Sequence, residues 1–192
     1  ASRELVRRAA VFPRGRFDLE ELSLLAEPRQ ALLDEAEGEE MLVRDEDRPG
    51  VWRFGSDVLR DVAYDSLAKR ERQRLHLRVA NKLGEGEHAD RFPRTVAYHL
   101  EQAAQAALDL NPGDRTLAER AVGALAHAGD IARRRIESRS AADLYERALV
   151  MAGSDEGWGD REAWILSVLG EARYWLGEFD ASESALHRAL AL

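Results

Sequence analysis

The chain of 192 residues contains no cysteine. A disulfide framework, a thiolate metal site and a cysteine nucleophile are therefore excluded, and we expect a reducing compartment, the cytoplasm. Long apolar runs are absent as well, because the longest stretch without Asp, Glu, Lys or Arg is the nine residues from Ala121 to Gly129. A helix that crosses a bilayer needs about 20 apolar residues, so we expect no membrane-spanning segment.

Motifs that would support catalysis are also missing. There is no Gly-x-x-x-x-Gly-Lys-Ser/Thr loop for nucleotide phosphates, and the Gly-rich stretch 84–87 carries two acids that would repel them. None of the histidines belongs to a His-Glu-x-x-His pair, so we expect no metal site and no cofactor. We expect His99 to form an interhelical hydrogen bond rather than to act in catalysis. The chain is thus predicted not to be an enzyme.

Charged side chains, in contrast, are plentiful. The 28 Lys or Arg and 36 Asp or Glu residues produce a formal net charge of -8, and 45% of the chain is hydrophobic. This hydrophobic content is enough for a buried core, so we expect a globular fold. The chain opens with Ala1-Ser2-Arg3-Glu4 and stops within an apolar helical pattern at Leu192. We therefore expect both ends to be cut from a longer protein.

Helical signals dominate the start of the chain. Residues 5–12 have helical apolar spacing, and Pro13-Arg14-Gly15 breaks that helix. Asp18 is a suitable N-cap for a second helix, and Pro28 suits the first turn of a third. Three short helices are therefore predicted before residue 41.

The apolar period then changes to that of strands. Residues 41–44 and 51–54 are β-prone segments on either side of a turn-rich loop, which predicts a hairpin. Ser56 or Asp57 caps the next helix, and a further helix follows. Three helices, a hairpin and trailing helices predict a winged-helix-like domain at residues 1–84, and the polar stretch from Gly84 to His88 marks its boundary.

Aligning the second half of the chain with itself reveals a repeat. Gly129 and Gly170 lie 41 positions apart, and each is followed twelve residues later by a small residue, Ala141 or Ser182. Small residues at these offsets are typical of tetratricopeptide repeats, whose usual period is about 34 residues. The additional residues fall in the Gly-rich stretch 152–160.

The predicted fold class is accordingly mainly α. A winged-helix-like domain with a small hairpin is followed by a tetratricopeptide-like array at residues 89–192. We expect this array to contain a degenerate half-repeat at 93–110 and two units at about 116–152 and 161–192.

A candidate partner-binding groove follows from this placement. The first helix of each tetratricopeptide unit lines the concave face, which directs five side chains toward it: Asp130, Arg133, Trp164, Glu171 and Tyr174. Aromatic anchors beside charges suit a peptide-binding surface, because the rings supply contact area and the charges supply register. Trp164 and Tyr174 could equally pack against a further repeat, so both interpretations stay open.

The distribution of charge argues against nucleic acid as a partner. The third helix of a winged helix enters the major groove and needs basic residues. Between Pro28 and Glu40, however, the only base is Arg29, and five acids oppose it: Asp34, Glu35, Glu37, Glu39 and Glu40. The wing tip, residues 45–48, is also net acidic. A DNA-binding winged helix of a transcription factor is kept as the alternative function.

Basic side chains gather elsewhere, at Lys69, Arg70, Arg72, Arg74 and Arg78 and at Arg133, Arg134, Arg135 and Arg139. Solvated helix faces explain such runs most simply, and cations near a helix C-terminus are favoured by its dipole. A functional interpretation is that the basic faces and the acidic wing dock onto the rest of a larger protein.

Several segments together resemble a known family. The stretch Phe54-Gly55-Ser56-Asp57-Val58-Leu59-Arg60-Asp61-Val62-Ala63-Tyr64-Asp65-Ser66-Leu67, followed by Arg70-Glu71-Arg72-Gln73-Arg74-Leu75-His76, resembles the region after the ATPase core in bacterial signalling ATPases of the STAND type. These include ATPase-linked class III adenylate cyclases and large transcriptional activators. The segments 9–17 and 97–103 resemble the start of the family's winged helix and of its repeat array. The family usually has His where this chain has Ser56, which puts nucleotide sensing by that residue in doubt.

This resemblance implies a regulatory role. In such proteins the winged helix packs on the ATPase and holds it inactive, while the repeats receive an inducer or partner protein. The chain is therefore expected to be a non-catalytic regulatory and protein-interaction segment. Its expected partners are the ATPase core of the parent protein and a protein or peptide inducer.

Overall fold

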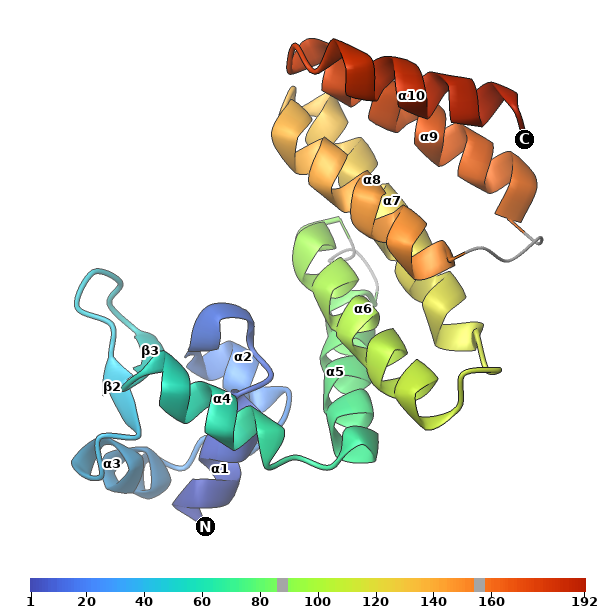
Figure 1. Ribbon diagram of the computed structural model, residues 1–192. Coiled ribbons are helices and arrows are strands. Elements are labelled where there is room, and N and C mark those ends of the chain that lie inside the picture. The colour runs from blue at the N-terminus through green and yellow to red at the C-terminus, as the bar shows by residue number, and fades with distance from the viewer. Residues whose placement is uncertain (86–89, 154–157) are drawn as a thin grey trace.

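The computed structural model describes residues 1–85, 90–153 and 158–192, and it is mainly helical with one small antiparallel sheet. The prediction of a mainly α chain is therefore confirmed. Figure 1 shows the N-terminal elements gathered around the sheet and the later helices stacked in pairs away from them. Within the described residues, no helix is both long and apolar enough to cross a membrane.

Three short helices occupy the start of the chain, as the apolar spacing predicts. They are α1 (Ser2–Ala9), α2 (Leu19–Ser23) and α3 (Gln30–Gly38). Asp18 caps α2 by accepting a hydrogen bond from the Glu21 amide, while the Glu21 carboxylate accepts one from the Asp18 amide. This capping box confirms the predicted N-cap. α1 stops three residues earlier than the sequence pattern suggested.

The sheet contains the predicted hairpin and one strand that the sequence did not reveal. Its strands are β1 (Arg16–Asp18), β2 (Leu42–Arg44) and β3 (Val51–Phe54), in the order β1-β3-β2. β1 pairs antiparallel with β3, so that Phe17 lies opposite Trp52. Trp52 and Phe54 are both buried on the same face of β3, as alternation predicts. β1 escaped prediction because three residues after the short 3-10 turn η1 (Pro13–Gly15) show no period of their own.

The remaining helices follow one another along the chain. They are α4 (Asp57–Asp65), α5 (Lys69–Leu83), α6 (Pro93–Leu110), α7 (Thr116–Arg134), α8 (Ser138–Ala152), α9 (Gly159–Trp175) and α10 (Phe179–Leu190). Ser56 caps α4 by accepting a hydrogen bond from the Leu59 amide. From α5 onward, each helix packs against the next. α6 coincides with the expected half-repeat at 93–110.

Two hydrophobic cores divide the chain, and α5 contributes to both. Leu75 and Val79 belong to the N-terminal core with Phe12, Phe17 and Trp52, a core that continues through α1 to α4. The next residue on α5, Ala80, belongs instead to the core of the helical stack. The expected half-repeat α6 therefore has a partner helix, which the sequence interpretation had placed with residues 1–84. The boundary expected at Gly84–His88 lies partly outside the described residues, as does part of the stretch 152–160.

The two glycines that reveal the repeat mark close helix crossings. A Cβ atom on Gly129 would lie 2.6 Å from Tyr145 Cε1, and one on Gly170 would lie 2.7 Å from Leu186 Cγ. Because real Cβ contacts do not approach this closely, a side chain at either position would force the facing residue to shift. Ser182 adds a polar link by donating a hydrogen bond to the Gly170 carbonyl at 2.7 Å.

Candidate partner-binding surface

Three of the predicted groove residues form a chain of charges across α7 and α9. Arg133 Nη1 lies 3.4 Å from Glu171 Oε2, and Arg133 Nε lies 3.9 Å from Asp130 Oδ1. Asp130 also accepts a hydrogen bond of 2.8 Å from the hydroxyl of Tyr145 on α8. Burial, followed by this hydrogen bond to Asp130, raises the pKa of the Tyr145 phenol. The charges thus connect three helices on one surface.

Trp164 joins this group through an aromatic contact. Its ring stands edge-on to that of Tyr145, with centroids 6.3 Å apart, and 41% of the residue is exposed. Trp164 therefore packs against the chain and also presents part of its ring to solvent. Four of the five predicted residues therefore form one connected group with Tyr145: Asp130, Arg133, Trp164 and Glu171.

Tyr174 lies in a different setting. Its ring contacts Trp175 and Phe179 edge-on, each at a centroid separation of 5.6 Å. These three residues, with Leu186 and Leu190 of α10, form what we call the C-terminal aromatic patch. Its members are between 41% and 85% exposed, and part of it borders a groove of about 370 Å³.

The patch is centred on the turn between α9 and α10. This turn contains Gly177, since α9 ends at Trp175 and α10 begins at Phe179. The same turn brings Trp175 and Phe179 onto one surface with Tyr174. The sequence did not predict either residue as part of the groove, because Trp175 is the last residue of the first helix and Phe179 begins the second helix.

The predicted acidic face is present on α3, but the hairpin loop at residues 45–48 exposes less acid than expected. Asp34, Glu35 and Glu39 are exposed, whereas Glu37 lies 3.3 Å from Arg44 of β2. Asp45 is almost fully buried, and its carboxylate lies 3.1 Å from Arg16 Nε on β1. Asp45 therefore holds the sheet together instead of contributing charge to the tip.

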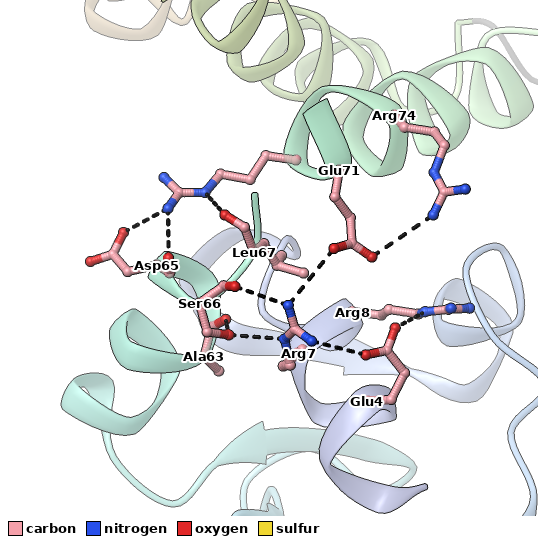
Figure 2. Close-up of polar contacts among 10 residues, drawn as sticks. Glu4, Arg7, Arg8, Ala63, Asp65, Ser66, Leu67, Glu71 and Arg74 are labelled. Carbon is pink, nitrogen blue, oxygen red and sulfur yellow. Dashed lines mark hydrogen bonds and ion pairs between the residues drawn. The ribbon is translucent and has the colours of Figure 1, made fainter. Parts of the chain in front are cut away.

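One arginine of the basic run of α5, Arg72, lies at the junction with the N-terminal helices. Arg72 donates hydrogen bonds of 3.0 Å to the carbonyls of Asp65 and Leu67, which closes the turn between α4 and α5. Figure 2 shows that Arg7 of α1 reaches the same turn. It donates to the Ser66 hydroxyl and carbonyl at 3.0 and 2.9 Å and lies 3.8 Å from Glu71 of α5. Arg72 thus serves the junction and is not a free docking cation.

A buried histidine pair fixes α5 to α6 at the same junction. The Nδ1 atoms of His76 and His99 are 2.9 Å apart and both residues are fully buried, which confirms the interhelical hydrogen bond expected for His99. His76 Nε2 lies 3.1 Å from the hydroxyl of Tyr64 on α4, and the rings of Phe12 and His99 form a T-shaped pair. Burial lowers the pKa of His76 to about 2 and that of His99 to about 3. Both imidazoles are therefore neutral at pH 7.

Comparison with known proteins adds no assignment to this surface. No protein-family model, curated protein or solved structure matches the chain. Among the described side chains, no group of three or more His, Cys, Asp or Glu is placed to hold a metal ion.

Proposed function

We propose that this chain is a non-catalytic regulatory and protein-interaction segment of a larger signalling ATPase. In this proposal the N-terminal elements act as a winged helix, and the paired helices act as a tetratricopeptide-like array that receives a partner protein. The observation that carries the proposal is the C-terminal aromatic patch. Its three rings, from Tyr174, Trp175 and Phe179, are each more than half exposed.

Exposed aromatic clusters of this kind suit a protein partner. Burying a large ring supplies much of the free energy of association, and Trp and Tyr are enriched among the residues that dominate interfaces. The linked side chains of Asp130, Arg133 and Glu171 add charges of both signs on α7 and α9. Such charges select partners and register more than they add affinity.

The junction between the two cores supports a coupling role. Arg7 ties α1 to the α4–α5 turn, and the His76–His99 pair ties α5 to α6. A force or displacement at α6 would therefore be passed to the N-terminal elements through packed side chains and hydrogen bonds. This arrangement is suited to relaying partner binding to an ATPase that contacts the N-terminal elements.

Binding to an ATPase core and to an inducer is tested by titration. The chain is titrated by calorimetry with the ATPase core of its parent protein, with and without the candidate inducer protein. We expect the Trp175→Ala/Phe179→Ala variant to weaken inducer binding by about tenfold or more. Val150→Ala, at another exposed apolar position on a helix, is the matched control and should bind as the parent chain does.

Two results would contradict this function. The first is absence of contact between the chain and the ATPase core both in trans and within one polypeptide. The second is a mobility shift with duplex DNA that weakens with salt, since the exposed acids of α3 predict that no such shift occurs.

A further inference from the structure

An arginine-rich cleft lies where the N-terminal elements meet the helical stack. Its volume is about 760 Å³, and the residues around it come from the η1 turn, α6 and α8. Clefts of roughly 300–1,000 Å³ are the usual size for small-molecule sites. Four arginines line it in a chain whose net charge is -8: Arg14, Arg94, Arg139 and Arg147. The acid Asp143 lines the cleft too, so the lining has a positive net charge, opposite in sign to that of the whole chain.

Two of these arginines are already neutralised by neighbouring acids. Arg147 donates to both carboxylate oxygens of Glu101, at 3.1 and 2.6 Å, and to Asp143 at 3.1 Å. The hydrogen bond to Glu101 is the largest cause that raises the pKa of the Arg147 guanidinium. Arg94 forms an ion pair with Glu137. These contacts connect α6 with α8 and fix the positions of the two helices that line the cleft.

The other two guanidinium groups are available. Within residues 1–85, 90–153 and 158–192, neither Arg14 nor Arg139 has an ion-pair or hydrogen-bond partner for its side chain, and both are exposed. The hydroxyls of Thr95 and Ser140 line the same cleft and likewise have no side-chain partner in the described part of the chain. Two cations and two hydroxyl donors thus face one space from three elements.

The backbone at Arg14 is a second sign that this side chain is placed for a purpose. Arg14 has φ 59°, in the left-handed region that a residue with a side chain rarely adopts. Such conformations cost about 1–3 kcal/mol and tend to occur at functional sites. Glycine would relieve this strain, yet the position carries a long cation at the edge of the cleft.

We propose that this cleft binds a small molecule through a phosphate or pyrophosphate group, which Arg14 and Arg139 contact directly. Guanidinium groups bind phosphate oxygens through paired, charge-assisted hydrogen bonds, and hydroxyl donors complete the shell. Because Arg14 belongs to the N-terminal elements and Arg139 to α8, the bound anion bridges the two cores. The site does not depend on the protein-binding function proposed above.

The test is titration of the chain with inorganic pyrophosphate, in which binding is measured by calorimetry and by changes in amide chemical shifts. We expect shifts on both sides of the cleft, at Gly15 and at Ser140. Arg14→Gly removes the cation while relieving the backbone, and Arg139→Ala removes the cation from a helix; each should weaken binding by about tenfold. Arg78→Ala, at an exposed α5 arginine without an ion partner in the described residues, should bind as the parent chain does.

A parallel titration with ADP distinguishes a nucleotide from a free polyphosphate, since both carry the pyrophosphate group. Tighter binding of ADP than of pyrophosphate identifies a nucleotide, and equal binding identifies free polyphosphate. The proposal is overturned if millimolar pyrophosphate produces no heat and no shifts, or if Arg78→Ala weakens binding as much as the cleft variants do. It is also overturned if an acidic peptide binds in the cleft and pyrophosphate does not.

Discussion

The helix pairs α7/α8 and α9/α10 share their spacing but differ in what covers the second helix. On α8, Tyr145 is fully buried, and α9 packs against that helix. The equivalent residue on α10, Leu186, is 41% exposed, and no described element packs on the outer side of α10. The same position in the two pairs therefore carries a large buried ring where a further helix packs on it, and a half-exposed aliphatic side chain where no described helix does.

The helix pair α5/α6, at the other end of the stack, is covered by the N-terminal elements. α5 and α6 meet the N-terminal elements there, and the buried contact between them is polar, formed by His76 and His99. A buried hydrogen-bonded pair is tolerable only where packing keeps water and protons out. The covered end is therefore expected to be sensitive to pH, whereas the open end has exposed aromatic rings.

Acid should produce the largest effect, at the covered end. The folded-state pKa values of His76 and His99, about 2 and about 3, lie below the usual value of 6.5. The unfolded chain therefore binds more protons below pH 6.5, so stability is complete above that pH and falls as pH falls. Each histidine contributes about 1.4 kcal/mol per pH unit, so the pair costs about 5 kcal/mol between pH 6.5 and 4.5.

The measurement is urea denaturation at several pH values in that window. The double variant His76→Phe/His99→Leu should lose most of the slope, while His187→Leu, at an exposed position on α10, should keep it. Arg60 and Arg72 also lower the pKa of His76, but burial is the larger cause and keeps that pKa well below the window, so Arg72→Ala should leave the slope unchanged. Equal slopes in the parent chain and the double variant would refute the role of the pair.

Truncation at the equivalent positions of the two pairs should separate them next. Tyr145→Ala removes a buried ring and the hydrogen bond to Asp130, so we expect a loss of about 3–5 kcal/mol in the free energy of unfolding. Leu186→Ala removes a side chain that is already half exposed and should cost about 1 kcal/mol. Denaturant midpoints measure both. Similar losses would show that Leu186 is covered in solution.

Filling the two glycine crossings should give a smaller contrast. An added Cβ on Gly129 meets the buried Tyr145 ring, which has no free space, so Gly129→Ala should cost about 1–3 kcal/mol. The Cβ of Gly170→Ala meets Leu186, whose exposed side chain can turn aside. Its cost should be below about 1 kcal/mol, because alanine also favours the helix. Thermal unfolding checks both, and a larger loss for Gly170→Ala would contradict this explanation.

The sequence revealed the helices and the hairpin because those signals are local. Capping at Asp18 and Ser56 and the spacing of Gly129 with Ala141 each depend on a few adjacent turns. It did not reveal β1, which exists only through pairing with β3, or the packing of α5 on α6. The arginine cleft was also beyond prediction, since Arg14 and Arg139 are 125 positions apart and line one cleft only after folding.

The smallest expected effect concerns the turns that end α7 and α9. Both close with the same hydrogen bonds, from the amide of Glu137 to the Ala132 carbonyl and from that of Glu178 to the Arg173 carbonyl. Gly177 holds the left-handed position of the second turn at φ 77°, but Ile136 holds that of the first at φ 60°. A β-branched residue is strained there, and Ile136 is 87% exposed, so it gains almost nothing from burial.

Ile136→Gly should therefore stabilise the chain by about 0.5–1 kcal/mol, since relief of strain exceeds the entropy that glycine adds to the unfolded state. Gly177→Ala is the matched change in the other pair and should destabilise by about 1 kcal/mol. Thermal unfolding of the two variants side by side gives the signs. A loss of stability in Ile136→Gly would mean that the Ile136 side chain makes contacts in solution that its exposure does not suggest, and the two turns would then not be equivalent.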